Sequence, residues 1–183
     1  RAGGLSVSTD GGDHWKHVPA GLPTGLLGRA NIGVAPGNAN VVYIFLDNRG
    51  PTTVKGRPYV GGEVYRSDDR GEHWRNANTE DLYDVFGVFG WKFADVHVDP
   101  RDANHVYILG NHAFQSFDGG ATWRRIGDKI LRLHDTDGRA LHLDQHELVI
   151  DPANPDRLLL GNDGGLLMSY DAGESWLHLN DIP

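Results

Sequence analysis

The chain has 183 residues, a formal net charge of −8 and a sequence pI of about 5.6. This acidic balance argues against a nucleic-acid groove and against binding to an anionic membrane surface. Hydrophobic residues make up 39% of the chain, which is enough to build a folded core. The sequence has no cysteine, so it holds neither a disulfide nor a thiolate site. Its 25 glycines indicate many tight turns.

One string with the skeleton Ser-x-Asp-x-Gly-x-x-Trp recurs four times along the chain. It reads STDGGDHW at 8–15, SDDRGEHW at 67–74, SFDGGATW at 116–123 and SYDAGESW at 169–176. A second marker precedes the last three copies and reads APGNANVVY at 35–43, DPRDANHVY at 99–107 and DPANPDRLL at 151–159. Two markers with the same rhythm indicate an internal structural repeat of roughly 50 residues.

Each repeat contains four short segments of strand character separated by Gly-rich turns, which is typical of a β-propeller blade. We therefore predict an all-β fold, a β-propeller built of four-stranded antiparallel blades, of which this chain holds about three and a half. The expected units are the last strands of one blade at 1–22 and further blades at 28–79, 88–128 and 140–181. A closed propeller usually has four to eight blades. The rest of a longer propeller, or another chain, is expected to complete the ring.

The repeated strings resemble the Asp-box of the BNR-repeat β-propellers, a superfamily that includes sialidases, xyloglucan-cleaving glycosidases and sortilin-type receptors. The run from His142 to Trp176 is similar to large secreted bacterial BNR-repeat proteins of the sortilin-like or glycosyl-hydrolase-like kind. This resemblance implies a secreted or periplasmic protein with its boxes on the outer hairpins of the blades. The Arg-Ile-Pro segment of sialidases is absent, because Arg125-Ile126 continues to Gly127. Sialidase activity is therefore disfavoured.

The fixed residues of the four strings are predicted to be structural. An Asp can accept backbone N–H groups across its own turn, a Gly permits positive φ, and a Trp returns an apolar plate to the hairpin. A catalytic acid is needed once per site and not once per blade, so calcium binding is the remaining alternative. The predicted structural residues are Ser8, Asp10, Gly12, Trp15, Ser67, Asp69, Gly71, Trp74, Ser116, Asp118, Gly120, Trp123, Ser169, Asp171, Gly173 and Trp176.

Functional residues are expected on the first strand of each blade, because that strand lines the central channel. Aligning the repeats on their turn prolines places Asn31, Asp95 and Glu147 at equivalent positions. Asp95 and Glu147 form a candidate catalytic pair, since glycoside hydrolysis uses two carboxylates. The alternative is that they bond backbone groups at the channel wall or meet water. The predicted ligand-binding residues are Asn31, Trp91, His97 and His146.

His142, Asp144 and His146 alternate in the run HLDQHE at 142–147. In a strand these three side chains would point to one face, where two imidazoles and a carboxylate could bind a divalent metal ion. We favour the alternative of a polar channel edge bonded to the next blade, because ligands spread along one strand strain a compact site. No cofactor is expected apart from this open question of calcium or another divalent ion.

Two functions remain open at this point. The favoured one is a non-catalytic propeller module that binds a protein, peptide or glycan, or that scaffolds an extracellular assembly. The alternative is part of a xyloglucanase-like glycoside hydrolase acting on polysaccharide. Facing carboxylates in an open groove would indicate the hydrolase, whereas a filled channel would indicate the scaffold. No membrane insertion is expected, because no apolar run approaches the roughly 20 residues of a membrane helix.

Overall fold

The computed structural model describes residues 5–18, 21–50, 61–87, 90, 92–127, 130–131 and 141–179. This part of the chain is almost entirely β-structure, with one four-residue helix, α1 (Tyr83–Phe86). The predicted all-β class is therefore confirmed. Within these residues there is no helix with the length and apolar character needed to cross a membrane.

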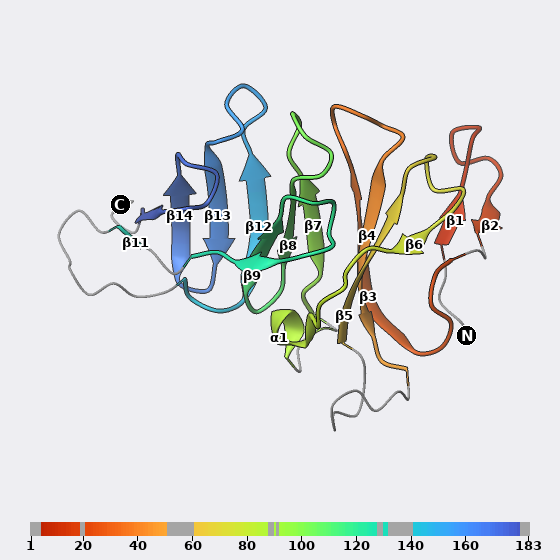
Figure 1. The fold of residues 1–183 in the computed structure, drawn as a ribbon, viewed down its shortest axis with the longest axis horizontal. Helices are drawn as coiled ribbons and strands as arrows, with labels where there is room; N and C mark the ends of the chain where they lie inside the picture. Colours follow the sequence, from red (N-terminus) through yellow and green to blue (C-terminus); the bar gives the residue numbers. More distant parts are fainter. Residues whose placement is uncertain are drawn as a thin grey trace.

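The described strands form four sheets that follow one another along the chain and lie side by side (Figure 1). The first is a two-stranded hairpin, the next two have four strands each, and the last has five. Within each sheet, neighbouring strands pair antiparallel, except that the short β11 runs parallel to its partner β15. The strands are β1 (Leu5–Val7), β2 (Lys16–Val18), β3 (Leu27–Val34), β4 (Val42–Asn48), β5 (Gly61–Ser67), β6 (Arg75–Asn76), β7 (Asp95–Val98), β8 (Val106–Leu109), β9 (Ala113–Ser116), β10 (Arg124–Arg125), β11 (Ile130–Leu131), β12 (Gln145–Ile150), β13 (Leu158–Asn162), β14 (Gly165–Ser169) and β15 (Trp176–His178).

The second strands β4 and β8 are buried along most of their length, because both of their faces are covered. On β4, Tyr43 and Phe45 are fully buried in the core that lies between this sheet and the next one. Ile44 and Leu46 point to the opposite face and pack in a separate core with the β1–β2 hairpin. Consecutive sheets are therefore stacked face to face, with one hydrophobic core between each pair.

The first strands of neighbouring sheets approach one another closely, and this approach positions the candidate site. On β7, Val96 and Val98 are buried against the preceding sheet, whereas Asp95 and His97 alternate with them and are only partly covered. A Cβ at Gly33 on β3 would lie only 2.8 Å from the carbonyl oxygen of Val96. Glycine at this position therefore permits the close contact between the two backbones.

The four repeated strings join β1 to β2, β5 to β6, β9 to β10 and β14 to β15, and they share one hydrogen-bond pattern. In each copy the Ser hydroxyl donates to the Asp carboxylate at 2.7–2.8 Å and accepts the N–H of the Gly. The Trp indole donates to the carbonyl of that Gly, whose φ is positive. The second oxygen of the Asp lies 2.6 Å from the side chain four residues later, which is His14, His73, Thr122 or Ser175. Both carboxylate oxygens are thus engaged within their own turn.

Candidate functional site

The carboxylate of Asp95 on β7 contacts two side chains of the neighbouring strand β3. The amide Nδ2 of Asn31 donates to its Oδ1 at 2.8 Å, and the Nη2 of Arg29 lies 3.8 Å from the same oxygen. Arg29 is itself fixed, because its Nη1 donates to the carbonyl of Lys92 at 2.8 Å. The structure therefore brings Asn31 and Asp95 together as direct partners across the seam between two sheets.

His97 lies on the same strand, within electrostatic reach of Asp95 and of Glu147 on β12. Its Nε2 is buried and has no hydrogen-bond partner among the described residues. Burial lowers the pKa of His97, while the negative charges of Glu147 and Asp95 act in the opposite direction. Glu147 itself is exposed on β12. Since a buried polar atom is normally hydrogen-bonded, the unpaired Nε2 of His97 is an exception within the described part of the chain.

His146, another predicted ligand-binding residue, lies on β12 and has partners of its own. Its Nε2 is 2.5 Å from the Oδ1 of Asp163, and its ring meets the ring of Phe93 edge-on at a centroid distance of 5.6 Å. The hydrogen bond from His146 lowers the pKa of Asp163. Trp91, the remaining predicted ligand-binding residue, lies outside the described residues.

The predicted alternation of His142, Asp144 and His146 along one strand is wrong. Strand β12 begins only at Gln145, and Asp144 has a positive φ of 64°, so the segment before the strand turns away from an extended path. The backbone explains this geometry, because the N–H groups of Asp144 and Gln145 donate to carbonyls of the preceding sheet's loop at Asn111 and Gly110. The metal site therefore has no support from a shared strand face.

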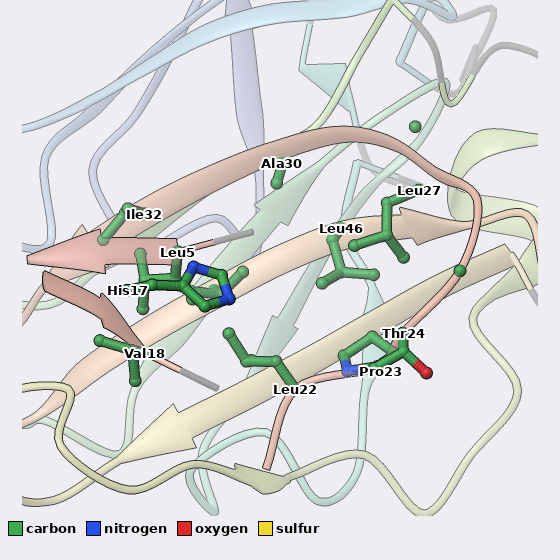
Figure 2. Close-up of a pocket in the computed structure, with 13 residues that line it drawn as sticks. Leu5, His17, Val18, Leu22, Pro23, Thr24, Leu27, Ala30, Ile32 and Leu46 are labelled. Carbon is green, nitrogen blue, oxygen red and sulfur yellow. The ribbon is translucent and has the colours of Figure 1, made fainter. Parts of the chain in front are cut away.

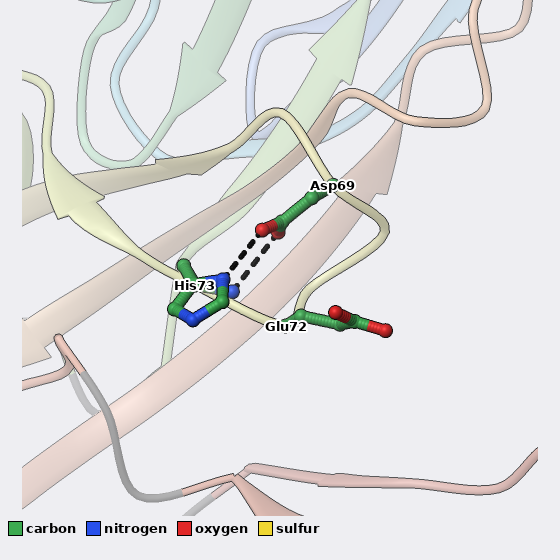
Figure 3. A group of neighbouring side chains, drawn as sticks. All are labelled: Asp69, Glu72 and His73. Atoms are coloured by element: carbon green, nitrogen blue, oxygen red, sulfur yellow. Dashed lines mark hydrogen bonds and ion pairs between the residues drawn. The ribbon is translucent and has the colours of Figure 1, made fainter.

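One group of three potential metal ligands does occur within the described part of the chain, and it lies in the second repeated string. Asp69, Glu72 and His73 offer ligand atoms within 4.8 Å of one another (Figure 3). Figure 3 shows that Asp69 and His73 already bond each other, with Nδ1 of His73 2.6 Å from Oδ2 of Asp69. The first string has the same Asp–His pair, which identifies this contact as a variant of the turn's own bonding pattern.

Sequence reasoning missed a set of ties at the second marker. The residue that opens each marker and the residue six positions later form the same backbone bond in all three copies. Their side chains differ: Asp99 pairs with His105 at 3.2 Å, Asp151 forms an ion pair with Arg157, and Ala35 and Val41 are both buried. The sequence does carry a signal for these ties. Where the residue that opens the marker is acidic, the residue six positions later is basic, and where the first is apolar, the later one is apolar too.

A further bond crosses from one marker to the next. Arg101 donates from Nη2 to Asp99 at 2.9 Å and to Asp156 of the following sheet at 2.7 Å. Burial works to raise the pKa of Asp99, but the hydrogen bonds and charge of Arg101 outweigh it and lower that pKa. These markers are thus turns that also tie neighbouring sheets together.

With this geometry in view, comparisons with known proteins identify the fold. No protein-family model matches the chain. The xyloglucanase Xgh74A of Acetivibrio thermocellus is 32% identical over 126 residues, which are 65% of this chain and 14% of the relative. Among solved structures, an ancestral GH74 enzyme has a TM-score of 0.59 at 18% identity, covering 96% of this chain and 21% of that one. The GH74 xyloglucanase of Xanthomonas campestris has a TM-score of 0.57 at 22% identity, covering 84% of this chain and 23% of that one.

The chain is part of a β-propeller. Its stacked four-stranded sheets are the blades, as predicted, and the resemblance to a propeller superfamily is confirmed at the level of the fold. YCF48 from Cyanidioschyzon merolae has the same fold, with a TM-score of 0.50 at 20% identity over 88% of this chain and 39% of that one. This partial propeller spans only about a seventh of the curated relative, whose covered share is 14%.

Proposed function

We propose that these blades form a non-catalytic part of a polysaccharide-binding propeller. The observation that carries the proposal is the seam at Asp95, whose carboxylate is held by Asn31 and lies near the guanidinium of Arg29. In glycoside hydrolysis each carboxylate must face the scissile bond, whereas Oδ1 of Asp95 already accepts a hydrogen bond from Asn31. Asp95 is therefore suited to holding the seam, and the proposal gives it no catalytic role.

The ligand class follows from the side chain that remains available beside this seam. The exposed carboxylate of Glu147 can form hydrogen bonds with hydroxyl groups. The similarity to a xyloglucanase supports a polysaccharide as the source of those hydroxyls. A polymer of this kind is met outside the cell, so the proposed location is secreted or periplasmic.

The second candidate function is a share in a glycoside hydrolase of the xyloglucanase type. The observation that favours it is the placement of Asp95 and Glu147 on neighbouring first strands, both close enough to His97 to affect its pKa. In this case one carboxylate would act from each strand on the two faces of a glycosidic bond.

A pair of variants in the full polypeptide distinguishes the two functions. If the blades bind without cleaving, Glu147→Gln weakens binding to xyloglucan several-fold, while any rate of xyloglucan hydrolysis stays within about twofold. Affinity electrophoresis and a reducing-end assay measure the two quantities, and Glu72→Gln, an exposed carboxylate in a repeated turn, is the matched control. A fall in hydrolysis of more than about a hundredfold for Glu147→Gln or Asp95→Asn would instead establish the hydrolase.

A further inference from the structure

The seams between consecutive sheets are filled in different ways. An apolar cavity of about 430 Å³ lies between the β1–β2 hairpin and the sheet β3–β6, with Leu5 and Val18 on one side and Leu46 on the other (Figure 2). The seam between the sheets β7–β10 and β11–β15 contains buried polar side chains. His105 directly precedes β8 and is 6% exposed, and Gln115 on β9 is 1% exposed. This seam can therefore respond to changes that leave an apolar contact unaffected.

The imidazole of His105 lies between a carboxylate and an amide. Its Nδ1 is 3.2 Å from Oδ2 of Asp99, and its Nε2 is 3.1 Å from the side-chain amide of Gln115. Although burial opposes it, the hydrogen bonds and charge of Arg101 lower the pKa of Asp99, so its carboxylate is ionised and only accepts. Nδ1 of His105 therefore carries a proton. The charge of the ring then depends on whether Nε2 carries one as well.

The orientation of the Gln115 amide determines the state of Nε2. With its nitrogen towards the imidazole, the amide donates to the carbonyl of Ala172 at 3.2 Å and to Nε2 of His105 at 3.1 Å. Its oxygen then accepts from Nη2 and Nε of Arg124 at 2.7 and 3.0 Å. The reverse orientation places donor against donor at Arg124 and acceptor against acceptor at Ala172. Since the first arrangement needs a lone pair on Nε2, His105 is neutral in it.

This amide also connects two sheets. Ala172 belongs to the fourth repeated string, in the last sheet, and its carbonyl also accepts from the hydroxyl of Tyr107 at 3.4 Å. Arg124 forms an ion pair with Glu174 of the same string. Gln115 and Arg124 therefore hold β9 and β10 against the turn of the neighbouring sheet.

We propose that protonation of His105 reverses the amide of Gln115 and loosens this seam, so that the contact between the two sheets is sensitive to acid. A proton on Nε2 needs an acceptor, and the group at hydrogen-bond distance is the amide of Gln115. Turning the amide oxygen towards the ring removes both bonds from Arg124 and the bond to Ala172. The charge of Asp99 favours the protonated ring, whereas the amide favours the neutral one. This inference stands apart from the proposed binding of polysaccharide.

The charged and titratable groups near the imidazole come from both sheets of the seam. Burial raises the pKa of Tyr107, whose ring centroid is 4.6 Å from that of His105, so its hydroxyl stays neutral. Carboxyl, phenol and guanidinium groups ordinarily titrate outside the range of about pH 5 to pH 8, in which an imidazole changes charge. The groups are Asp99, Arg101, Tyr107, Arg124, Asp156 and Glu174. The proposed change therefore belongs to His105.

The preceding seam has the same geometry without an imidazole. Aligning the repeats places Val41 at the position of His105 and Arg66 at the position of Gln115. Nη1 of Arg66 donates to Oδ1 of Asn104 in the next sheet at 2.6 Å. Because this contact involves no group that titrates near neutrality, it serves as an internal reference for the effect of pH.

Nuclear magnetic resonance of the 183-residue chain between pH 8 and pH 5 tests the proposal. Long-range ¹H–¹⁵N spectra are expected to show a proton on Nδ1 of His105 alone at pH 8 and on both nitrogens at pH 5. Over the same range, hydrogen exchange at Nε of Arg124 should rise at least about fivefold relative to exchange at Nε of Arg66. Nε of Arg66 donates to Asp68 at 2.8 Å, so the ratio of the two rates cancels the intrinsic effect of pH.

Two variants make the result specific to this amide. In Gln115→Glu one oxygen can accept from the charged ring and the other from Arg124, so Nε2 should be protonated at pH 8 and the exchange ratio should stay within about twofold. Asn40→Asp adds the same charge beside Arg70 in the first marker and should behave like the wild type.

The proposal is overturned if Nε2 of His105 is already protonated at pH 8 in the wild type, or if it stays unprotonated down to pH 5. It is also overturned if Nε2 gains its proton while the exchange ratio of Arg124 to Arg66 does not change, or if Gln115→Glu has the same pH dependence as the wild type.

Discussion

At the scale of single residues, the four repeated strings show how one turn tolerates different chemistry at a fixed position. The residue four after the Asp places its side chain 2.6 Å from the same carboxylate oxygen in every copy, whether it is His14, His73, Thr122 or Ser175. Imidazole and hydroxyl donors are interchangeable in geometry but not in their dependence on pH, since only the imidazole titrates near neutrality.

Replacing His73 with Thr should alter how stability depends on pH. The hydrogen bond and charge of Asp69 raise the pKa of His73, so its contribution is complete below the unfolded value of 6.5 and is lost as the pH rises above it. His73→Thr should remove that loss, and Thr122→His should introduce it in the third string. Urea midpoints at pH 5.5 and pH 8.5 measure both effects, and identical pH dependence of H73T and wild type would contradict the assignment.

The acid limb should be unchanged in that variant. The backbone N–H and side chain of His73 and the hydroxyl of Ser67 lower the pKa of Asp69 to about 2. Asp118, whose corresponding partner is Thr122, also has a pKa lowered to about 2. Because a depressed carboxylate pKa stabilises the fold above its unfolded value, both turns lose this contribution only as the pH falls from about 4 towards 2.

At the scale of elements, the sequence predicts blades well because its markers are local. Ser, Asp, Gly and Trp of each string interact within eight residues, so their spacing alone specifies the turn. The contact between Asn31 and Asp95 is harder to predict, because the two residues meet only after two sheets have stacked. The failed strand at His142 and Asp144 has the same origin, since its path is bent by carbonyls of a loop more than thirty residues earlier.

The stacking of the sheets predicts that one substitution lowers the free energy of unfolding by very different amounts at two equivalent positions. Trp176 is fully buried between the last two sheets, whereas Trp15 is 66% exposed. Trp176→Ala should lower the free energy of unfolding by about 3–5 kcal/mol, because it opens a large cavity in a core. Trp15→Ala should cost less than about 1 kcal/mol. Chemical denaturation measures both, and comparable losses would contradict the described packing.

At the scale of the whole molecule, the described sheets lie side by side, and apolar side chains stay exposed near both ends of the row (Figure 1). Ile32 and Val34 lie on β3, next to the terminal hairpin, and Val149 lies on the last sheet; all three side chains are more than half exposed. Apolar surfaces of this kind, together with open strand edges, promote association between copies. A propeller avoids this only when neighbouring blades cover both faces.

The 183-residue chain alone should therefore self-associate. Sedimentation velocity at rising protein concentration is expected to show an increasing weight-average mass for the wild type. The double variant Ile32→Asp with Val149→Asp should remain monomeric over the same range, because each change charges one end face. Tyr170→Asp, an exposed aromatic on a repeated turn, serves as the control and should associate like the wild type. A wild-type chain that stays monomeric throughout would refute the prediction.

The three marker ties differ in how they respond to salt and to temperature. One tie is apolar at Ala35 and Val41, one joins Asp99 to an imidazole, and one joins Asp151 to a guanidinium. High salt screens the exposed guanidinium tie and leaves the apolar one unaffected, whereas cooling weakens the apolar tie first. Neither salt nor cooling therefore weakens all three ties to the same extent, because the three copies are chemically different at these two positions.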